Sequence, residues 1–134
     1  MAKTATPVVP RVKVWLETDG EYVFGRGISD ILKAVDEAGS IKAGAERIGK
    51  SYRHVWSRIK EAEEQLDVSL VETHVGGASD QRSTLTDLAR ALISHYEALR
   101  TRVLELVATE FSEQFEQLIA GGRRAAKTSQ SNGK

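Results

Sequence analysis

Side chains that can contact a nucleic acid gather in one short stretch of this 134-residue chain. Between Lys42 and Lys60 there are six lysine or arginine residues and one acidic residue, Glu46. Serine, tyrosine and histidine side chains lie among them at positions 51–58. Cationic side chains bind phosphate, and arginine also pairs with guanine through two hydrogen bonds. The composition of this stretch therefore indicates docking on DNA.

The overall charge leaves two interpretations of this stretch open. The chain has 19 basic and 19 acidic residues, so its formal net charge is zero. A run without lysine or arginine follows directly, and its acidic residues are Glu61, Glu63, Glu64, Asp67 and Glu72. A basic surface beside an acidic one is compatible with docking on phosphate, and a solvated surface of mixed charge is the alternative.

Other functional classes find little support in the sequence. There is no cysteine, and His54, His74 and His95 do not have the spacing of metal ligands. Neither a phosphate-binding loop nor a Ser-His-Asp set is apparent, so we expect no enzyme, no catalytic residue, no metal and no cofactor. No apolar run approaches the roughly 20 residues of a membrane span, and residues 1–10 lack the apolar segment of a signal peptide, so we expect no secretory signal. We expect a cytoplasmic protein without a membrane partner.

Two short predicted helices place the basic stretch in a helix-turn-helix. Ser40 is an N-cap candidate for a helix over 41–48, and Ser51 for a helix that runs to about Leu66. The motif needs a small residue in its first helix, a turn residue that tolerates positive φ, and an inward-facing branched residue in its second helix. These three requirements are met by Ala45, Gly49 and Val55. Such a second helix presents its first turns to the major groove of DNA.

This geometry predicts which side chains contact DNA. They come from the start of the second helix, from its flanks and from a later hairpin. The expected set is Lys42, Lys50, Ser51, Tyr52, Arg53, His54, Ser57, Arg58 and Arg82. Val55 faces inward, so we expect its neighbour Trp56 to pack at the edge of the buried stripe; the alternative is a DNA contact, for which Trp56 would have to point outward. For Tyr52, packing and groove contact are both open.

A β-hairpin is predicted on each side of the helices. Apolar residues alternate over 12–16 as in a half-buried strand, and Asp19-Gly20 favours a type I′ turn before a returning strand at 22–24. A helix from about Ile28 to Gly39 follows. Beyond the helix-turn-helix, β-prone residues at 70–71 and 83–85 flank a glycine-rich loop. This second hairpin is the expected wing, and Arg82 beside its tip is the expected phosphate contact.

The C-terminal part of the chain predicts one long helix and a dimer. Thr86 is an N-cap candidate, and the helix is expected to end at Gly121-Gly122. Apolar residues with alternating spacings of four and three form a coiled-coil seam of Leu92, Tyr96, Leu99, Val103 and Leu106. We therefore expect a flexible tail (1–10), a winged helix-turn-helix domain (11–85), a dimerisation helix (86–120) and a disordered tail (121–134). The fold class is mainly α.

The stretch 36–66 resembles the N-terminal DNA-binding domain of the ModE family of molybdate-responsive regulators, which is related to the LysR type. The shared sequence motifs are Glu37-Ala38-Gly39-Ser40-Ile41, Ser51-Tyr52-Arg53 with Trp56, Leu70-Val71-Glu72, Gly76-Gly77 and Leu85-Thr86. The resemblance extends over roughly 12–99 and implies DNA binding and dimerisation. Two features depart from it: Ala89 stands where the family usually has glycine, and no room is left for molybdate-binding domains.

The sequence as a whole predicts a bacterial homodimer that binds double-stranded DNA in a sequence-specific way and regulates transcription. Two alternatives remain at this point. One is a module that senses an oxyanion such as molybdate. The other is an interaction protein that binds another regulator and has no affinity for DNA itself.

Overall fold

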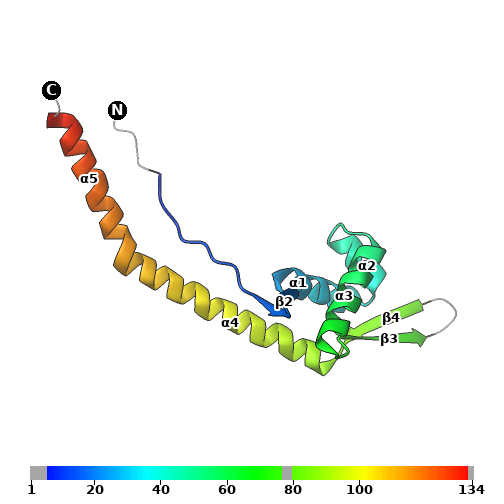
Figure 1. The fold of residues 1–134 in the computed structure, drawn as a ribbon. Coiled ribbons are helices and arrows are strands. Elements are labelled where there is room, and N and C mark those ends of the chain that lie inside the picture. Colours follow the sequence, from blue (N-terminus) through cyan, green and yellow to red (C-terminus); the bar gives the residue numbers. More distant parts are fainter. Residues whose placement is uncertain (1–5, 77–79, 133–134) are drawn as a thin grey trace. The chain divides into compact units, whose positions relative to one another are not determined.

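The computed structural model describes residues 6–76 and 80–132, which are mostly helical. The chain forms two compact units, a winged unit of residues Val14–Ala98 and a helical unit of Met1–Lys13 with Leu99–Lys134. The predicted fold class is confirmed: an N-terminal β-hairpin precedes three helices, a second hairpin and long C-terminal helices (Figure 1). Within the described residues, no helix is long and apolar enough to cross a membrane.

The N-terminal hairpin pairs β1 (Trp15–Thr18) with β2 (Glu21–Gly25) in antiparallel fashion. Asp19 and Gly20 have φ values of 51° and 78°, as the predicted turn requires. The strand begins at Trp15, later than expected, and all four of its residues are exposed. Of the residues expected to be half-buried, Val12 and Val14 are half-buried but precede the strand, and Leu16 is exposed. Burial falls on β2 instead, because its residues face the helices.

Three helices follow, α1 (Arg26–Ala38), α2 (Ile41–Arg47) and α3 (Tyr52–Leu66). Their ends are set by local signals that the sequence predicted. Gly39 ends α1 in the left-handed conformation with φ 86°. The hydroxyls of Ser40 and Ser51 each accept a hydrogen bond of 3.0 Å, from the backbone N–H of Ala43 and of His54.

The core lies between these helices and the strands beside them. Its largest fully buried side chains are Phe24, Ile28, Leu32, Val35, Val55, Ile59 and Leu70. Full burial of one such side chain stabilises a fold by roughly 1.5–3 kcal/mol. The helix-turn-helix is therefore stabilised by apolar packing against α1, against β2 and against the residue that precedes the second hairpin.

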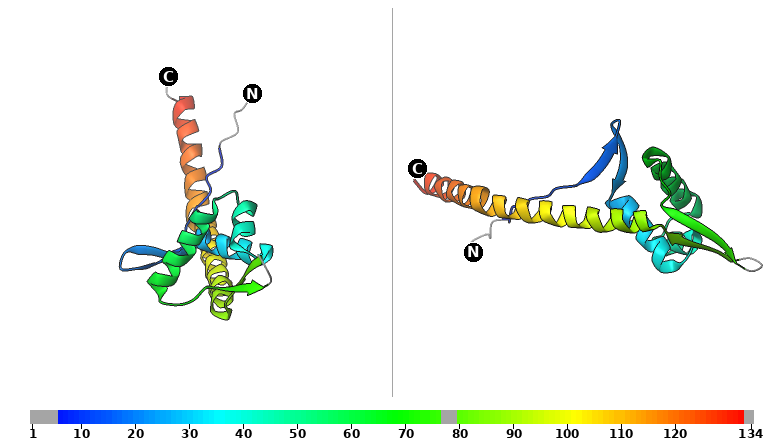
Figure 2. Two further views of the ribbon diagram at one scale, coloured as in Figure 1. Left: turned by 90° about the vertical axis from the view of Figure 1, so that its right-hand side faces the viewer. Right: turned by 90° about the horizontal axis from the view of Figure 1, so that it is seen from below.

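The second hairpin pairs β3 (Val71–Gly76) with β4 (Asp80–Leu85). It forms a sheet separate from β1–β2, and the two hairpins project in different directions from the helices (Figure 2). The backbone N–H of Ser83 donates to the carbonyl of Gly39 at 2.9 Å, which fixes β4 against the end of α1. Residues 77–79 of the predicted loop lie outside the described residues.

The helix α4 (Asp87–Phe111) begins at the predicted cap, since the Thr86 hydroxyl accepts a hydrogen bond from the Ala89 N–H at 3.1 Å. Its first turns pack on the winged unit. Tyr96 is buried there, and its ring lies edge-on to the ring of Phe24 with 5.5 Å between the ring centroids. Its hydroxyl donates a hydrogen bond of 2.8 Å to the Val14 carbonyl. Two residues of the predicted seam, Leu92 and Tyr96, thus pack against the core of their own domain.

In the helical unit, α4 continues through a π-helical turn (Ser112–Glu116) into α5 (Gln117–Asn132). The predicted stop at Gly121-Gly122 was wrong, because α5 continues through both glycines. A glycine inside a helix costs about 1 kcal/mol relative to alanine, which lowers stability without forcing an end. Arg123 also donates a hydrogen bond to the Thr6 carbonyl at 3.0 Å, so residue 6 of the predicted flexible tail contacts the helix.

Candidate nucleic-acid interface

The turn between α2 and α3 has the geometry that the sequence predicted. Ala45 in α2 and Val55 in α3 are buried, and Gly49 between them has φ 68°. A further glycine, Gly44, was not singled out from the sequence. A Cβ atom at Gly44 would lie 2.9 Å from the Cα and N atoms of Val35, so glycine at this position lets α1 and α2 approach closely.

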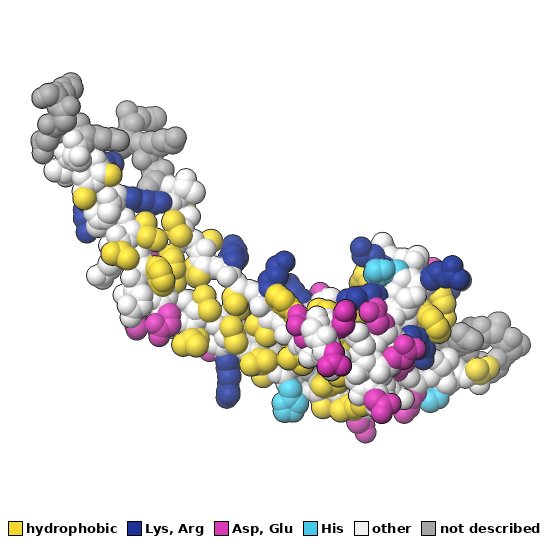
Figure 3. All heavy atoms as spheres, in the orientation of Figure 1, with side chains coloured by type: hydrophobic (Ala, Val, Ile, Leu, Met, Phe, Trp, Pro, Cys, Tyr) yellow, Lys and Arg dark blue, Asp and Glu magenta, His cyan; other side chains and the backbone are white. Residues whose placement is uncertain are grey.

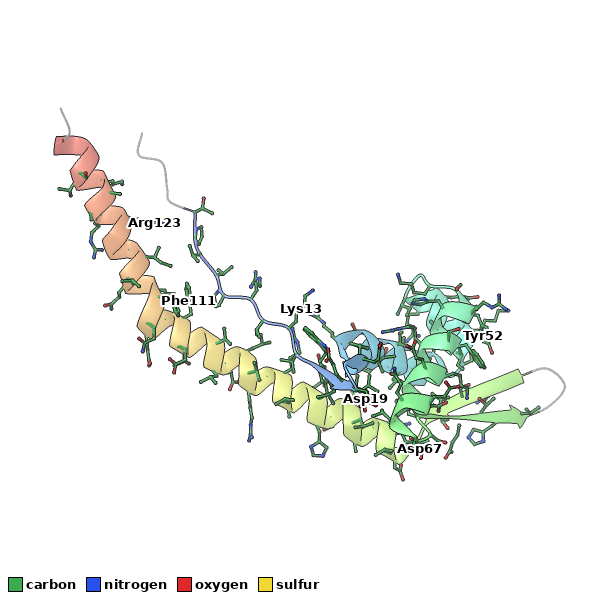
Figure 4. All side chains as sticks on the ribbon, viewed as in Figure 1. Lys13, Asp19, Tyr52, Asp67, Phe111 and Arg123 are labelled. Carbon is green, nitrogen blue, oxygen red and sulfur yellow. The ribbon has the colours of Figure 1, made fainter. Side chains whose placement is uncertain are left out.

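The buried residues of α3 determine which side chains face outward. Val55, Ile59 and Ala62 are buried, and the positions opposite to them on a helix of 3.6 residues per turn include Arg53 and Ser57. Tyr52 and Trp56 lie along one edge of this outward surface, and His54 and Arg58 along the other. The labels in Figure 4 place Tyr52 at the start of α3 and Asp67 at its end.

The structure brings most of the predicted contact residues together. Those on α2, the turn and the first turns of α3 are Lys42, Lys50, Ser51, Tyr52, Arg53, His54, Ser57 and Arg58. All are exposed except Arg58, which is half-buried and stacks over the Tyr22 ring at 5.1 Å. Arg82 lies apart from this group on β4, where it is opposite His74 in the register of the second hairpin. The Ser51 hydroxyl also caps α3, which leaves its proton to donate.

The charges around α3 are divided along its length. Four cationic side chains of the winged unit are paired with carboxylates, namely Lys33 with Glu97, Arg47 with Glu37, Lys60 with Glu63 and Arg90 with Asp36. Among the residues that the structure describes, Lys42, Lys50, Arg53 and Arg58 have no such partner. Lys and Arg side chains gather over α2 and the start of α3 in Figure 3.

The far end of α3 is acidic. Glu61 and Glu64 are exposed, and Asp67 follows the helix in the left-handed conformation. Acidic side chains at this end would be repelled by phosphate, whereas the unpaired cations at the other end attract it. The electrostatics therefore favour one docking direction, with the first turns of α3 toward the nucleic acid.

Trp56 differs from the expectation. It is 43% exposed, so the predicted packing was wrong. The side chain lies on the edge of α3 beyond the core, and Lys60 Nζ lies 5.9 Å from its ring centroid. Within the part of the chain that the structure describes, no three His, Asp or Glu side chains are grouped so that they could hold a metal ion.

Comparisons with known proteins find a family model, curated relatives and a solved structure to which this chain is similar. Residues 30–90 match the family model described as bacterial regulatory helix-turn-helix protein, lysR family. The molybdenum-pterin-binding protein MopB of Rhodobacter capsulatus is 29% identical over 72% of this chain and 35% of its own length. The transcriptional regulator ModE of Yersinia pestis is 34% identical over 53% of this chain and 27% of its own length. The crystal structure of a CbnR_DBD–DNA complex aligns with 76% of this chain and 95% of its own protein chain, with 24% sequence identity and a TM-score of 0.45.

Residues 30–90 of this chain are thus similar to the helix-turn-helix of the lysR type, and the predicted resemblance to the ModE family is confirmed. It spans only about a third of the length of the curated relatives that it matches.

Proposed function

We propose that this chain is a transcriptional regulator that binds double-stranded DNA as a homodimer, with α3 in the major groove. The observation that carries the proposal is the group of unpaired cations Lys42, Lys50, Arg53 and Arg58 around the first turns of α3. Cations without an acidic partner are available to neutralise phosphate, and each such contact releases condensed counterions. We assign no catalytic role to any residue.

The individual side chains divide between two kinds of contact. Arg53 lies on the outward surface of α3, so we assign it to base edges in the groove, where arginine pairs with guanine. Lys50 precedes α3 and Lys42 lies at the start of α2, so we assign both to phosphate. The hairpin β3–β4 acts as the wing, and Arg82 on it contacts the DNA backbone.

The homodimer is supported by apolar side chains on α4 and the helical segments after it. Leu99, Leu106, Phe115 and Leu118 are exposed, and Leu106 is 60% accessible to solvent. Phe111 and Phe115 stack at 5.8 Å, and Phe115 is still 51% exposed. Rows of exposed apolar side chains mark interaction surfaces. A second copy of the same helices would cover them with a matching surface and would provide two copies of α3 for a two-fold symmetric site.

Salt-dependent binding to duplex DNA tests the proposal. We would measure the affinity for a labelled duplex of mixed sequence by fluorescence anisotropy between 50 and 200 mM salt. For the wild type, the logarithm of the affinity should fall linearly with the logarithm of the salt concentration. Lys50→Ala should weaken binding and reduce the slope by about 0.9, the value for one phosphate contact.

Lys33→Ala is the matched control, because it removes one positive charge that is paired with Glu97 on the winged unit. It should leave the slope unchanged. Equal effects of the two substitutions would show that only net charge matters, and binding without salt dependence would contradict the proposed interface. Failure to bind any duplex would favour a protein that holds another regulator.

A further inference from the structure

The recognition helix α3 carries two aromatic side chains that the proposed phosphate and guanine contacts do not use. Tyr52 is 48% exposed and Trp56 is 43% exposed. Four residues separate them, so both lie on the same edge of α3, one turn apart. This edge is next to Arg53 and belongs to the half of the helix that carries the unpaired cations.

Neither aromatic residue contributes to the core of the domain. Both are absent from the apolar cluster and from the partly buried residues that pack against it. Within the described part of the chain, neither the Tyr52 hydroxyl nor the Trp56 indole N–H has a hydrogen-bond partner. The Lys60 ammonium group near the Trp56 ring is at the outer limit of a cation–π contact. The fold therefore does not account for two large aromatic side chains at this place.

The major groove offers one apolar group to such side chains, the C5-methyl group of thymine. We propose that Trp56, with Tyr52 one turn before it, packs against thymine methyl groups and makes A·T base pairs a requirement of the recognised site. This inference rests on the proposed function, since it needs α3 to enter the groove. Trp56 is then a specificity-determining residue, and Arg53 beside it reads guanine.

The spacing of the two residues suits neighbouring base pairs. Four residues of α-helix rise by about 6 Å, and successive base pairs are about 3.4 Å apart. Tyr52 and Trp56 therefore span about two base-pair steps where the helix follows the groove. We expect thymines one or two steps apart in each half-site, next to a G·C pair that Arg53 contacts.

Replacing thymine by deoxyuridine tests the inference without changing the protein. The probe is the duplex enriched by the wild type from a random pool, with each thymine in turn replaced by deoxyuridine, which lacks only the methyl group. At one or two positions per half-site the wild type should lose about fourfold in affinity for each methyl, the factor for one buried methyl-sized group. Trp56→Ala should bind the thymine and deoxyuridine duplexes equally at the position that Trp56 contacts, and any preference at the position that Tyr52 contacts should remain.

Trp15→Ala is the matched control, because Trp15 is 49% exposed but lies on the N-terminal hairpin. It should keep the full preference for thymine. A Trp15→Phe variant leaves Trp56 as the single tryptophan, and its fluorescence should change on addition of the duplex.

Three results would overturn the inference. Equal affinity of the wild type for every thymine and deoxyuridine duplex would show that the methyl groups are not read. A selected site without A·T pairs, or an unchanged thymine preference in Trp56→Ala, would do the same. In each of these cases sequence-specific binding itself persists, whereas failure of the proposed function would abolish enrichment of any duplex.

Discussion

The carboxylate of Glu63 in α3 accepts a hydrogen bond of 2.7 Å from the backbone N–H of Leu70, at the start of the wing. The same oxygen accepts a second bond of 3.2 Å from the N–H of Val71, and Lys60 pairs with the other oxygen at 3.1 Å. One side chain thus fixes the wing strand to the helix that carries the proposed base contacts. The position of the wing relative to α3 depends on this contact.

Removal of the Glu63 carboxylate should destabilise the winged unit. Glu63→Ala leaves two backbone N–H groups without their acceptor, and we expect a loss of about 1–3 kcal/mol in the free energy of unfolding. Glu63→Gln keeps one acceptor oxygen and should lose less. Urea unfolding measures both, with Glu64→Ala as the control, since Glu64 is exposed on the same helix. Equal unfolding midpoints for Glu63→Ala and Glu64→Ala would disprove the role of this contact.

A methyl group at Gly44 should also be destabilising. It would approach the Val35 backbone to 2.9 Å and force α1 and α2 apart, at a cost of about 1–3 kcal/mol. Gly122→Ala is the matched control, because nothing lies within 4 Å of its added Cβ. In that helical position alanine should be neutral or stabilising by up to about 1 kcal/mol. Thermal unfolding distinguishes the two, and a Gly44→Ala variant as stable as the wild type would refute the close approach.

The Lys33–Glu97 pair predicts a specific dependence of stability on pH. A hydrogen bond to Glu97 and the charge of that carboxylate raise the pKa of Lys33 above its ordinary value of 10.5. Because the folded state has the raised pKa, the stabilising contribution is complete below 10.5 and is lost as the pH rises through the folded-state pKa. Lys33→Met should therefore have a small penalty that is constant between pH 6 and 9 and disappears only above 10.5. A penalty that fades between pH 7 and 9 in unfolding experiments would contradict this assignment.

Disruption of the proposed dimer should not unfold the winged unit. Leu106→Asp places a charge on an exposed apolar position, and we expect monomers by analytical ultracentrifugation with an unchanged circular dichroism spectrum. Leu88→Asp changes an equally apolar, exposed position of α4 outside the predicted seam and should remain dimeric. If Leu106→Asp sediments like the wild type, the dimer contact lies elsewhere.

Local signals in the sequence predicted most of the fold. The caps at Ser40, Ser51 and Thr86 and the turns at Asp19-Gly20 and Gly39 depend on residues within about four positions, which is why a single sequence reveals them. The order of hairpin, three helices, wing and long helix follows from these boundaries. So does the group of contact residues around the start of α3.

The differences between prediction and structure concern contacts between distant segments. Tyr96 has the spacing of a dimer seam, yet it is buried because β2 and Val14 lie against it. Trp56 lies next to an inward residue, and only the final shape of the domain shows that no neighbour covers it. Gly44 is important through its distance to Val35, which no local pattern encodes. Gly121 and Gly122 predict a helix end because glycine tolerates positive φ, but the helix continues through both of them.

The assignment of Arg53 to base edges has its own test. Arg53→Ala should cost on the order of 1–3 kcal/mol at the selected site and relax the sequence preference at one position. Lys50→Ala should weaken binding to all sequences to a similar degree. If Arg53→Ala also weakens all sequences uniformly, Arg53 contacts phosphate and another residue reads the base.

Selection of duplex DNA from a random pool, at near-physiological salt, tests whether this chain is a dimeric, sequence-specific regulator. We expect an enriched motif with two-fold symmetry, because a homodimer presents two copies of α3 to two half-sites. Absence of enrichment, with weak binding that vanishes as the salt concentration rises, would contradict a sequence-specific regulator.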